Sequence, residues 1–71
     1  MDLPHILGRN LRDHRTRRGL SQEQLALDAD MKRSYVSDLE RGTRNPSVKA
    51  IARLATALHM APWELLRPPD L

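Results

Sequence analysis

Apolar residues recur three and four positions apart along this chain. In its second half the recurring positions are Val48, Ile51, Leu54, Ala55 and Leu58. Near the N-terminus they are Leu3, Leu7 and Leu11, followed by His14 or Arg15. This spacing places side chains on one face of a helix, whereas a half-buried strand alternates with a period of two. No such alternation persists, so the sequence predicts an all-α fold.

Capping residues separate five expected helices. Glycine best accepts the left-handed conformation that follows a last helical turn, so Gly19 and Gly42 are expected to end the first and third helices. Ser21 and Gln24 form the S-x-x-Q pattern of a capping box, and Ser47 is a second N-cap. The expected helices span about 3–18, 22–29, 33–41, 48–58 and 62–66, the last with the sequence PWELL.

The length predicts a single domain over residues 1–71, with 67–71 as a tail. A chain of 71 residues buries only about 60% of its unfolded surface, so one small core is expected. The chain has no cysteine, which excludes disulfides. It lacks an apolar run near 18 residues and a basic leader before an apolar stretch, so neither a membrane span nor a secretory signal is expected. A cytoplasmic location is expected.

Positive charge is concentrated in two segments. Lys and Arg total 12 against 9 Asp and Glu, and a net charge of +3 alone favours an anionic partner only weakly. The cations gather at Arg9, Arg12, Arg15, Arg17 and Arg18, and again at Lys32, Arg33, Arg41 and Arg44. Tyr35 and Trp63 are the only aromatic residues, so a stacking platform for single strands is not expected.

The second and third helices, joined by a turn of about three residues, form a helix-turn-helix candidate at about 21–42. At about 100° per residue, Val36 and Leu39 define the buried face of the third helix. The opposite face carries Ser34, Ser37, Asp38 and Arg41, with Arg33 at its side. Such groups can hydrogen-bond to guanine or cytosine in the major groove. The alternative is a solvated face on which Asp38 and Arg41 form an i,i+3 ion pair.

The stretches GLSQEQLALDA (19–29) and RSYVSDLERGTRNPS (33–47) resemble the Xre-type, lambda-repressor-like family of DNA-binding domains. The shared pattern is S-Q-x-x-L-A followed by S-x-x-E-R-G-x-x-x-P, and the resemblance extends more loosely over about 7–66. The third-helix string is especially similar to the controller proteins of restriction-modification operons. The resemblance implies a compact five-helix domain that regulates transcription by placing its third helix in the major groove of double-stranded DNA.

The outward face and the resemblance together predict residue roles. Side chains expected to meet base edges are Lys32, Arg33, Ser34, Tyr35, Ser37 and Asp38. Side chains expected on the DNA backbone are Gln22, Arg41, Thr43, Arg44 and Asn45. Gln22 begins the second helix, where the dipole favours an anion, although it could instead help the cap. Tyr35 either completes the core beside Val36 or lies along the groove wall.

The resemblance also implies a largely buried ion pair between Arg15 and Glu40. Glu40 lies at the edge of the expected buried face of the third helix, where an unpaired carboxylate is costly. Arg15, on the first helix, is the family's usual partner for this glutamate. The pair is therefore expected to join the first and third helices.

Three residues depart from the family pattern. Asp30 replaces a turn glycine, Lys32 replaces a capping Ser or Thr, and His14 stands where Leu is common. Aspartate tolerates the left-handed conformation, so the turn is expected to survive, while the third helix is expected to be less firmly capped. His14 is expected to be a core or boundary residue. His5 and His59 give no ligand spacing with it, so no metal site is expected.

Trp63 occupies a position where the family tolerates polar residues. An exposed large aromatic side chain suggests an interface, so we expect a homodimer centred on Trp63, with Met60 and Leu66. Symmetric dimers place two recognition helices about one turn of DNA apart, on a palindromic operator. The alternative is that Trp63 folds back on its own core.

Other function classes are less well supported by the residues. No nucleophile and base are paired and the chain is short for an enclosed pocket, so an enzyme, a cofactor or a small-molecule effector is not expected. Membrane association is disfavoured because the apolar face of the first helix is required for the core. A protein-binding adaptor or antitoxin could use the same scaffold without reading DNA.

Overall fold

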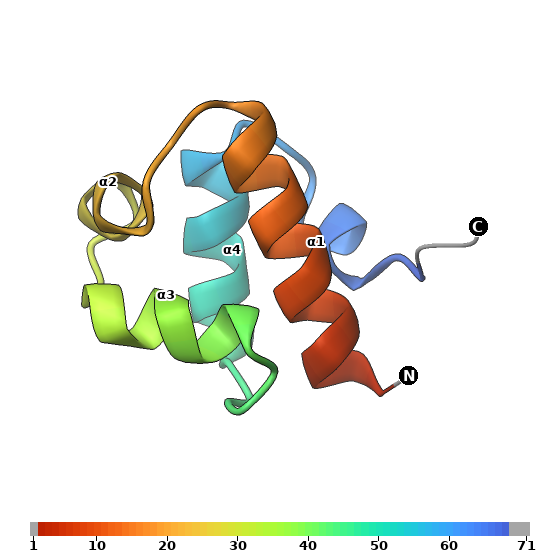
Figure 1. Cartoon of the computed structure of the whole chain (residues 1–71). Helices are drawn as coiled ribbons and strands as arrows, with labels where there is room; N and C mark the ends of the chain where they lie inside the picture. Colours follow the sequence, from red (N-terminus) through yellow and green to blue (C-terminus); the bar gives the residue numbers. More distant parts are fainter. Residues whose placement is uncertain (1, 69–71) are drawn as a thin grey trace.

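A computed structural model describes residues 2–68, which form four α-helices and one 3-10 helix without any strand (Figure 1). The elements are α1 (Leu3–Arg17), α2 (Gln22–Asp28), α3 (Arg33–Glu40), α4 (Val48–Ala57) and η1 (Pro62–Leu66). The predicted all-α class is confirmed, and every α-helix ends within one residue of its expected boundary. Of the expected tail, residues 69–71 lie outside the described part of the chain.

The expectation of five helices is wrong for the last segment, because PWELL forms a 3-10 helix. Pro62 begins this helix, Glu64 Oε2 accepts a hydrogen bond from the Ala61 N–H at 3.1 Å, and Arg67 is already extended. A five-residue α-helix would gain very few i→i−4 bonds for the cost of nucleation. The tighter 3-10 turn is the form that such short pieces commonly adopt.

Side-chain caps hold the starts of three helices. Ser21 Oγ accepts from the Gln24 N–H at 3.0 Å, and Ser47 Oγ caps α4 in the same way. Asp2 Oδ1 caps α1 by accepting from the His5 N–H, and this hydrogen bonding with His5 lowers the pKa of the Asp2 carboxyl. In a full capping box the Gln24 side chain would also accept a hydrogen bond from the Ser21 N–H. Here the Gln24 side chain instead donates to Asp28.

The two departures in the turn between α2 and α3 have the expected effects. Asp30 adopts the left-handed conformation expected at this position, with φ of 56°. Lys32 occupies the N-cap of α3 and makes no side-chain capping hydrogen bond. The N-terminal end of α3 is therefore held by its backbone and by packing alone.

The helices surround one apolar core. α3 packs against α1 and α2, and η1 packs against α1 and α4, so that the first and last elements lie together (Figure 1). The fully buried large side chains are Leu7, Leu11, Leu25, Leu39, Leu54, Leu58, Leu65 and Val36. The predicted buried face of α3, made by Val36 and Leu39, is confirmed, and both residues have 0% exposure.

Two residues predicted to be buried are exposed. Leu3 is 57% exposed and Val48 is 85% exposed, although both continue the apolar period of their helices. Each is the first residue of its helix, where the chain has not yet reached the neighbouring elements. On α1 the buried positions are instead Ile6, Leu7, Gly8 and Leu11.

Gly8 allows α1 to approach the C-terminal end of α3 closely. A Cβ atom added at Gly8 would lie 2.3 Å from the carbonyl oxygen of Leu39 and 2.8 Å from that of Glu40. These are backbone atoms, so neither can move aside as a flexible side chain could. The periodicity of the sequence gave no indication of this contact, since a glycine within a helix has no distinctive spacing.

A largely buried ion-pair network joins α1, α2 and α3. Arg15 Nε donates to Glu40 Oε2 at 2.6 Å and Arg15 Nη2 donates to Glu40 Oε1 at 3.0 Å, which is the pairing that the resemblance implied. The side chains are only 13% and 5% exposed, respectively. Arg15 Nη1 also donates to the Leu20 carbonyl, and Gln22 Nε2 donates to Glu40 Oε1 at 3.1 Å. Hydrogen bonding to Glu40 raises the pKa of the Arg15 guanidinium.

The Gly8 contact predicts that Gly8→Ala destabilises the protein. Helix propensity alone would make this change stabilising by about 1 kcal/mol, but the added methyl group would overlap two carbonyl oxygens. We expect a lower melting temperature by circular dichroism. Gly19→Ala gives the cost of a positive φ alone, because Gly19 has a φ of 70° and open space around it. Gly8 lies within α1 and has no positive φ, so a loss of stability there comes from the overlap. Stabilisation by Gly8→Ala would show that α1 does not need this close approach.

The buried network predicts a large cost for Arg15→Ala. Removing Arg15 leaves the largely buried Glu40 carboxylate with only the neutral Gln22 amide as a partner, which costs about 3 to 5 kcal/mol in free energy of unfolding. The control is Arg17→Ala, which removes the exposed Arg17–Asp13 pair of the same helix and is expected to cost less than about 1 kcal/mol. Urea denaturation of both variants measures the difference. Equal unfolding midpoints would exclude the proposed role of Glu40.

Candidate nucleic-acid interface

The outward face of α3 presents most of the predicted base-reading residues together. Lys32, Arg33 and Ser34 are exposed, while Ser37 and Asp38 are half-buried beside them. One shallow open depression on this face is lined by Arg33, Ser34, Ser37, Asp38 and Arg41. Because Val36 and Leu39 hold the opposite face in the core, this surface has a fixed orientation relative to the rest of the domain.

Asp38 forms ion pairs with two arginines at the C-terminal end of this surface. Arg41 Nη2 donates to Asp38 Oδ1, and Arg44 Nε lies 3.5 Å from Asp38 Oδ2. The i,i+3 pair of the alternative interpretation is therefore present. The sequence did not indicate the second pair, with Arg44, because that contact depends on how the chain turns after α3.

Tyr35 lies between the core and the outward surface. Its ring is half-buried and packs against the apolar core, which fits the first of the two expected positions. The guanidinium carbon of Arg44 lies 5.2 Å from the ring centroid, a distance suited to a cation–π interaction. The same side chain therefore belongs to the core on one side and supports a surface arginine on the other.

The turn after α3 is fastened to the helix. Both the backbone N–H and the hydroxyl of Thr43 donate to the Asp38 carbonyl at 3.1 Å. Gly42 takes a left-handed conformation with φ of 77°, and the His5 ring packs so closely that a Cβ at Gly42 would overlap it. Arg44 and Asn45 remain exposed in this turn. The predicted DNA-backbone residues of the turn are thus held beside the predicted base-reading ones.

Gln22 has a structural contact that sequence reasoning missed. Its side-chain amide is half-buried and donates to Glu40, so it belongs to the network that positions α3. A primary amide carries two N–H donors, and this contact uses one of them. A glutamine at the start of a helix has no spacing that distinguishes a role inside the fold from one at the surface.

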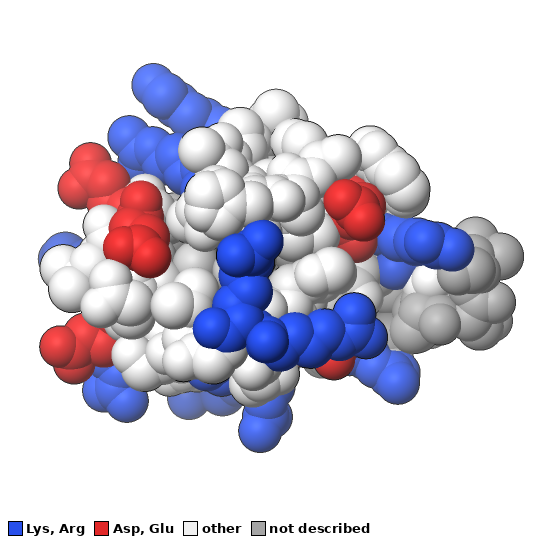
Figure 2. Space-filling model, turned by 90° about the horizontal axis from the view of Figure 1, so that it is seen from above, with Lys and Arg blue, Asp and Glu red and all other residues white. Residues whose placement is uncertain are grey.

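The charge of the outward surface is mostly positive. Its cations are Lys32, Arg33, Arg41 and Arg44, and Asp38 is its one acid among the described residues of α3 and of the turn 41–45, because the Glu40 side chain turns toward α1. Basic side chains also occur elsewhere, as Figure 2 shows at the end of the molecule where α1 terminates. The arrangement of groups on α3, and not basicity alone, distinguishes the candidate interface.

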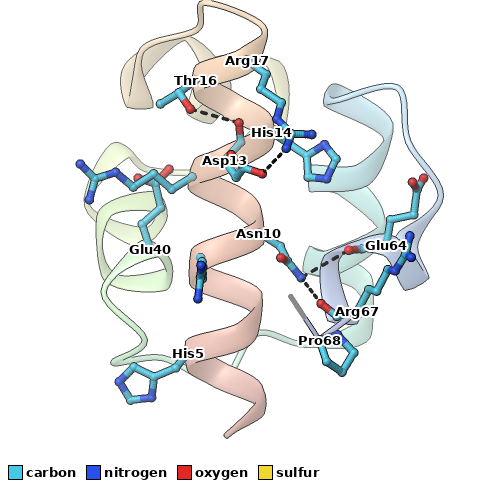
Figure 3. A pocket seen from close by; sticks show the side chains of 12 residues that line it. His5, Asn10, Asp13, His14, Thr16, Arg17, Glu40, Glu64, Arg67 and Pro68 are labelled. Carbon is cyan, nitrogen blue, oxygen red and sulfur yellow. Dashed lines mark hydrogen bonds and ion pairs between the residues drawn. The ribbon is translucent and has the colours of Figure 1, made fainter. Parts of the chain in front are cut away.

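A second hollow runs along α1 toward η1 (Figure 3). Asn10 Nδ2 donates to the carbonyl oxygens of Leu65 and Arg67 at 2.9 and 2.8 Å, which fastens η1 to α1. His14, half-buried as expected for a boundary residue, also lines this groove. Among residues 2–68, no group of three or more His, Cys, Asp or Glu side chains could hold a metal ion.

The predicted dimer residues lie on or next to η1. Trp63 is 62% exposed, so the alternative in which it folds back on the core is wrong. Leu65 occupies the core instead, and Met60 and Leu66 are partly buried against it. Within the described part of the chain, no helix has the length and apolar character needed to cross a membrane.

Comparison with known proteins identifies relatives over nearly the whole chain. A family model described as a helix-turn-helix domain matches residues 6–67. The uncharacterized HTH-type transcriptional regulator y4dJ of Sinorhizobium fredii is 39% identical over 70 residues, covering 99% of this chain and 91% of that protein. The control protein C.BamHI of Bacillus amyloliquefaciens is 42% identical over 62 residues, covering 86% of this chain and 76% of that one.

A solved structure agrees with these sequence matches. The restriction-modification controller protein C.AhdI from Aeromonas hydrophila has a TM-score of 0.85 and 50% identity, covering 87% of this chain and 94% of that one. The resemblance indicated by the motifs is thereby confirmed. Because the family model extends over residues 6–67, this chain belongs to the helix-turn-helix domain family.

Proposed function

We propose that this protein is a transcriptional regulator that binds double-stranded DNA sequence-specifically, as a homodimer on a palindromic operator with α3 in the major groove. The observation that carries the proposal is the outward face of α3, where donors and acceptors lie among cations on a helix anchored by a buried ion pair. An α-helix fits the major groove, and such side chains can distinguish its base pairs. The relatives are named as regulators and controllers, and none of these names is that of an enzyme.

We assign two kinds of contact to the interface. The proposed base-reading residues are Lys32, Arg33, Ser34, Tyr35, Ser37 and Asp38. The proposed phosphate-contacting residues are Gln22, Arg41, Thr43, Arg44 and Asn45. Phosphate contacts position a protein on the duplex without reading sequence, whereas contacts to base edges specify it. The second N–H of the Gln22 amide can serve a phosphate while the first stays on Glu40.

The dimer that we propose forms through η1 and the end of α4. Trp63 is a large exposed aromatic side chain at this position, with the partly buried Met60 and Leu66 beside it. The Asn10 amide holds η1 against α1, so Trp63 projects from a fixed support. A two-fold axis here would bring two copies of α3 onto successive major grooves of a palindrome. In bacteria such as those that carry the relatives, DNA lies in the cytoplasm, so we propose that location.

The two kinds of contact predict different effects for Arg33→Ala and Arg44→Ala. With an operator selected from a random duplex pool, Arg33→Ala should lose about 1 to 3 kcal/mol of discrimination at one base pair. Arg44→Ala should weaken binding to both operator and random DNA without changing the preference at any single base pair, and should reduce the slope of log affinity against log salt by about 1. Fluorescence anisotropy at several salt concentrations measures both effects.

Two outcomes would contradict this assignment. Equal weakening of operator and random DNA by both variants would remove the distinction between base and phosphate contacts. A wild-type protein that binds no duplex DNA at low salt would instead favour the adaptor or antitoxin alternative.

The dimer proposal predicts that Trp63→Ala shifts the protein toward monomer. Removing the indole deletes the largest exposed apolar side chain at the proposed interface, so sedimentation velocity at micromolar concentration should show a smaller species. Leu27→Ala is the control, because Leu27 is 68% exposed on α2, outside the proposed interface. A wild-type protein that is already monomeric at these concentrations would refute the proposed dimer.

A further inference from the structure

Each carboxylate oxygen of Asp38 has an arginine partner on the outward surface of α3. Arg41 contacts Oδ1 and Arg44 contacts Oδ2, and the Asp38 side chain is 26% exposed, against 65% and 55% for its two partners. Arg44 is further held by the Tyr35 ring. Two of the cations proposed to hold DNA phosphates are therefore paired internally in the free protein.

Contact with DNA sets up a competition for these arginines. A phosphate draws Arg41 and Arg44 toward itself, which leaves the Asp38 carboxylate without partners and close to a strongly negative duplex. An ionised carboxylate can only accept hydrogen bonds, so phosphates and guanine O6 and N7 cannot replace the lost partners. An exocyclic amine can, and in the major groove only cytosine N4 and adenine N6 supply one.

We propose that Asp38 determines specificity by opposing binding to DNA that presents no exocyclic amine to it. On the operator a base amine replaces the arginines at Asp38, and Arg41 and Arg44 then serve the phosphates at little cost. On random DNA the same phosphate contacts leave Asp38 unpaired. Asp38 thus lowers non-specific affinity more than operator affinity. This inference rests on the proposed DNA-binding function and adds a repulsive element to its attractive contacts.

The test is Asp38→Asn, which keeps the size of the side chain and removes its charge. Affinity for random duplex DNA should rise on the order of tenfold, because Arg41 and Arg44 no longer have to give up two partly exposed ion pairs to reach the phosphates. Operator affinity should rise less or fall, so the operator-to-random ratio decreases. Selection from a random duplex pool should also move toward adenine at the facing position, since asparagine pairs with adenine N6 and N7.

Control variants separate this effect from a change in net charge. Asp13→Asn removes one negative charge and one exposed ion pair, with Arg17, on α1. It should change random and operator affinities equally and by less than Asp38→Asn does. Asp38→Ser should reproduce the rise in random affinity without the shift toward adenine. In an Arg41→Ala background the gain from Asp38→Asn should shrink, because one of the two competing pairs is already absent.

The outcomes distinguish this inference from the proposed function. If the wild-type protein selects an operator but Asp38→Asn and Asp38→Ser change random affinity no more than Asp13→Asn does, the inference is overturned while the function stands. If the Asp38 variants raise operator and random affinities by the same factor, Asp38 adds repulsion without specificity, and the inference is again overturned. A wild-type protein that binds no duplex DNA overturns both.

Discussion

The buried carboxylate of Glu40 is the constraint on which the arrangement of the first three helices depends. A charge with 5% exposure is tolerable only if it is paired and hydrogen-bonded, and Glu40 obtains its partners from Arg15 on α1 and Gln22 on α2. Satisfying this one group therefore fixes where both neighbouring helices must lie relative to α3. The apolar contacts of Val36 and Leu39 bury the same helix, but the hydrophobic effect behind them is non-directional.

The two acids of α3 illustrate how location decides the role of a charge. Glu40 faces inward, where its ion pair with Arg15 is shielded from water and serves the fold. Asp38 lies two residues earlier on the other side of the helix, where its partners Arg41 and Arg44 are largely solvated. An ion pair in water is weak enough to be exchanged for another partner, whereas a buried one is costly to break. Only the outer pair is suited to a change on binding.

Much of the fold could be predicted because it follows from local rules. The three-and-four spacing located the buried face of α3, the serine caps located the starts of α2 and α4, and the glycines located two helix ends. The prediction that Leu3 and Val48 are buried was wrong, because periodicity does not show where a helix extends past its neighbours. The role of Gly8 was not predicted, because this glycine makes room for the backbone of α3, which is distant from it in sequence.

The candidate site was predictable as a set of residues but not as a set of contacts. The outward face of α3 follows from its helical period, so Arg33, Ser34 and Ser37 were correctly placed near one another. The pairing of Arg44 with Asp38, and its position over Tyr35, depend on the turn after Gly42. The His5 ring lies against Gly42 at the start of that turn, a contact that no local rule predicts.

These contacts leave the two ends of α3 unequally restrained. At the C-terminal end, Glu40 is buried in its ion pair, Gly8 packs directly on the backbone and Thr43 fastens the turn. At the N-terminal end, Lys32 makes no capping bond with its side chain. Side chains near Lys32 and Arg33 can therefore be exchanged with little cost to the fold. Asp38, whose exposed ion pairs can be exchanged on binding, lies near this anchored end, where the backbone that carries its partners Arg41 and Arg44 is held in place.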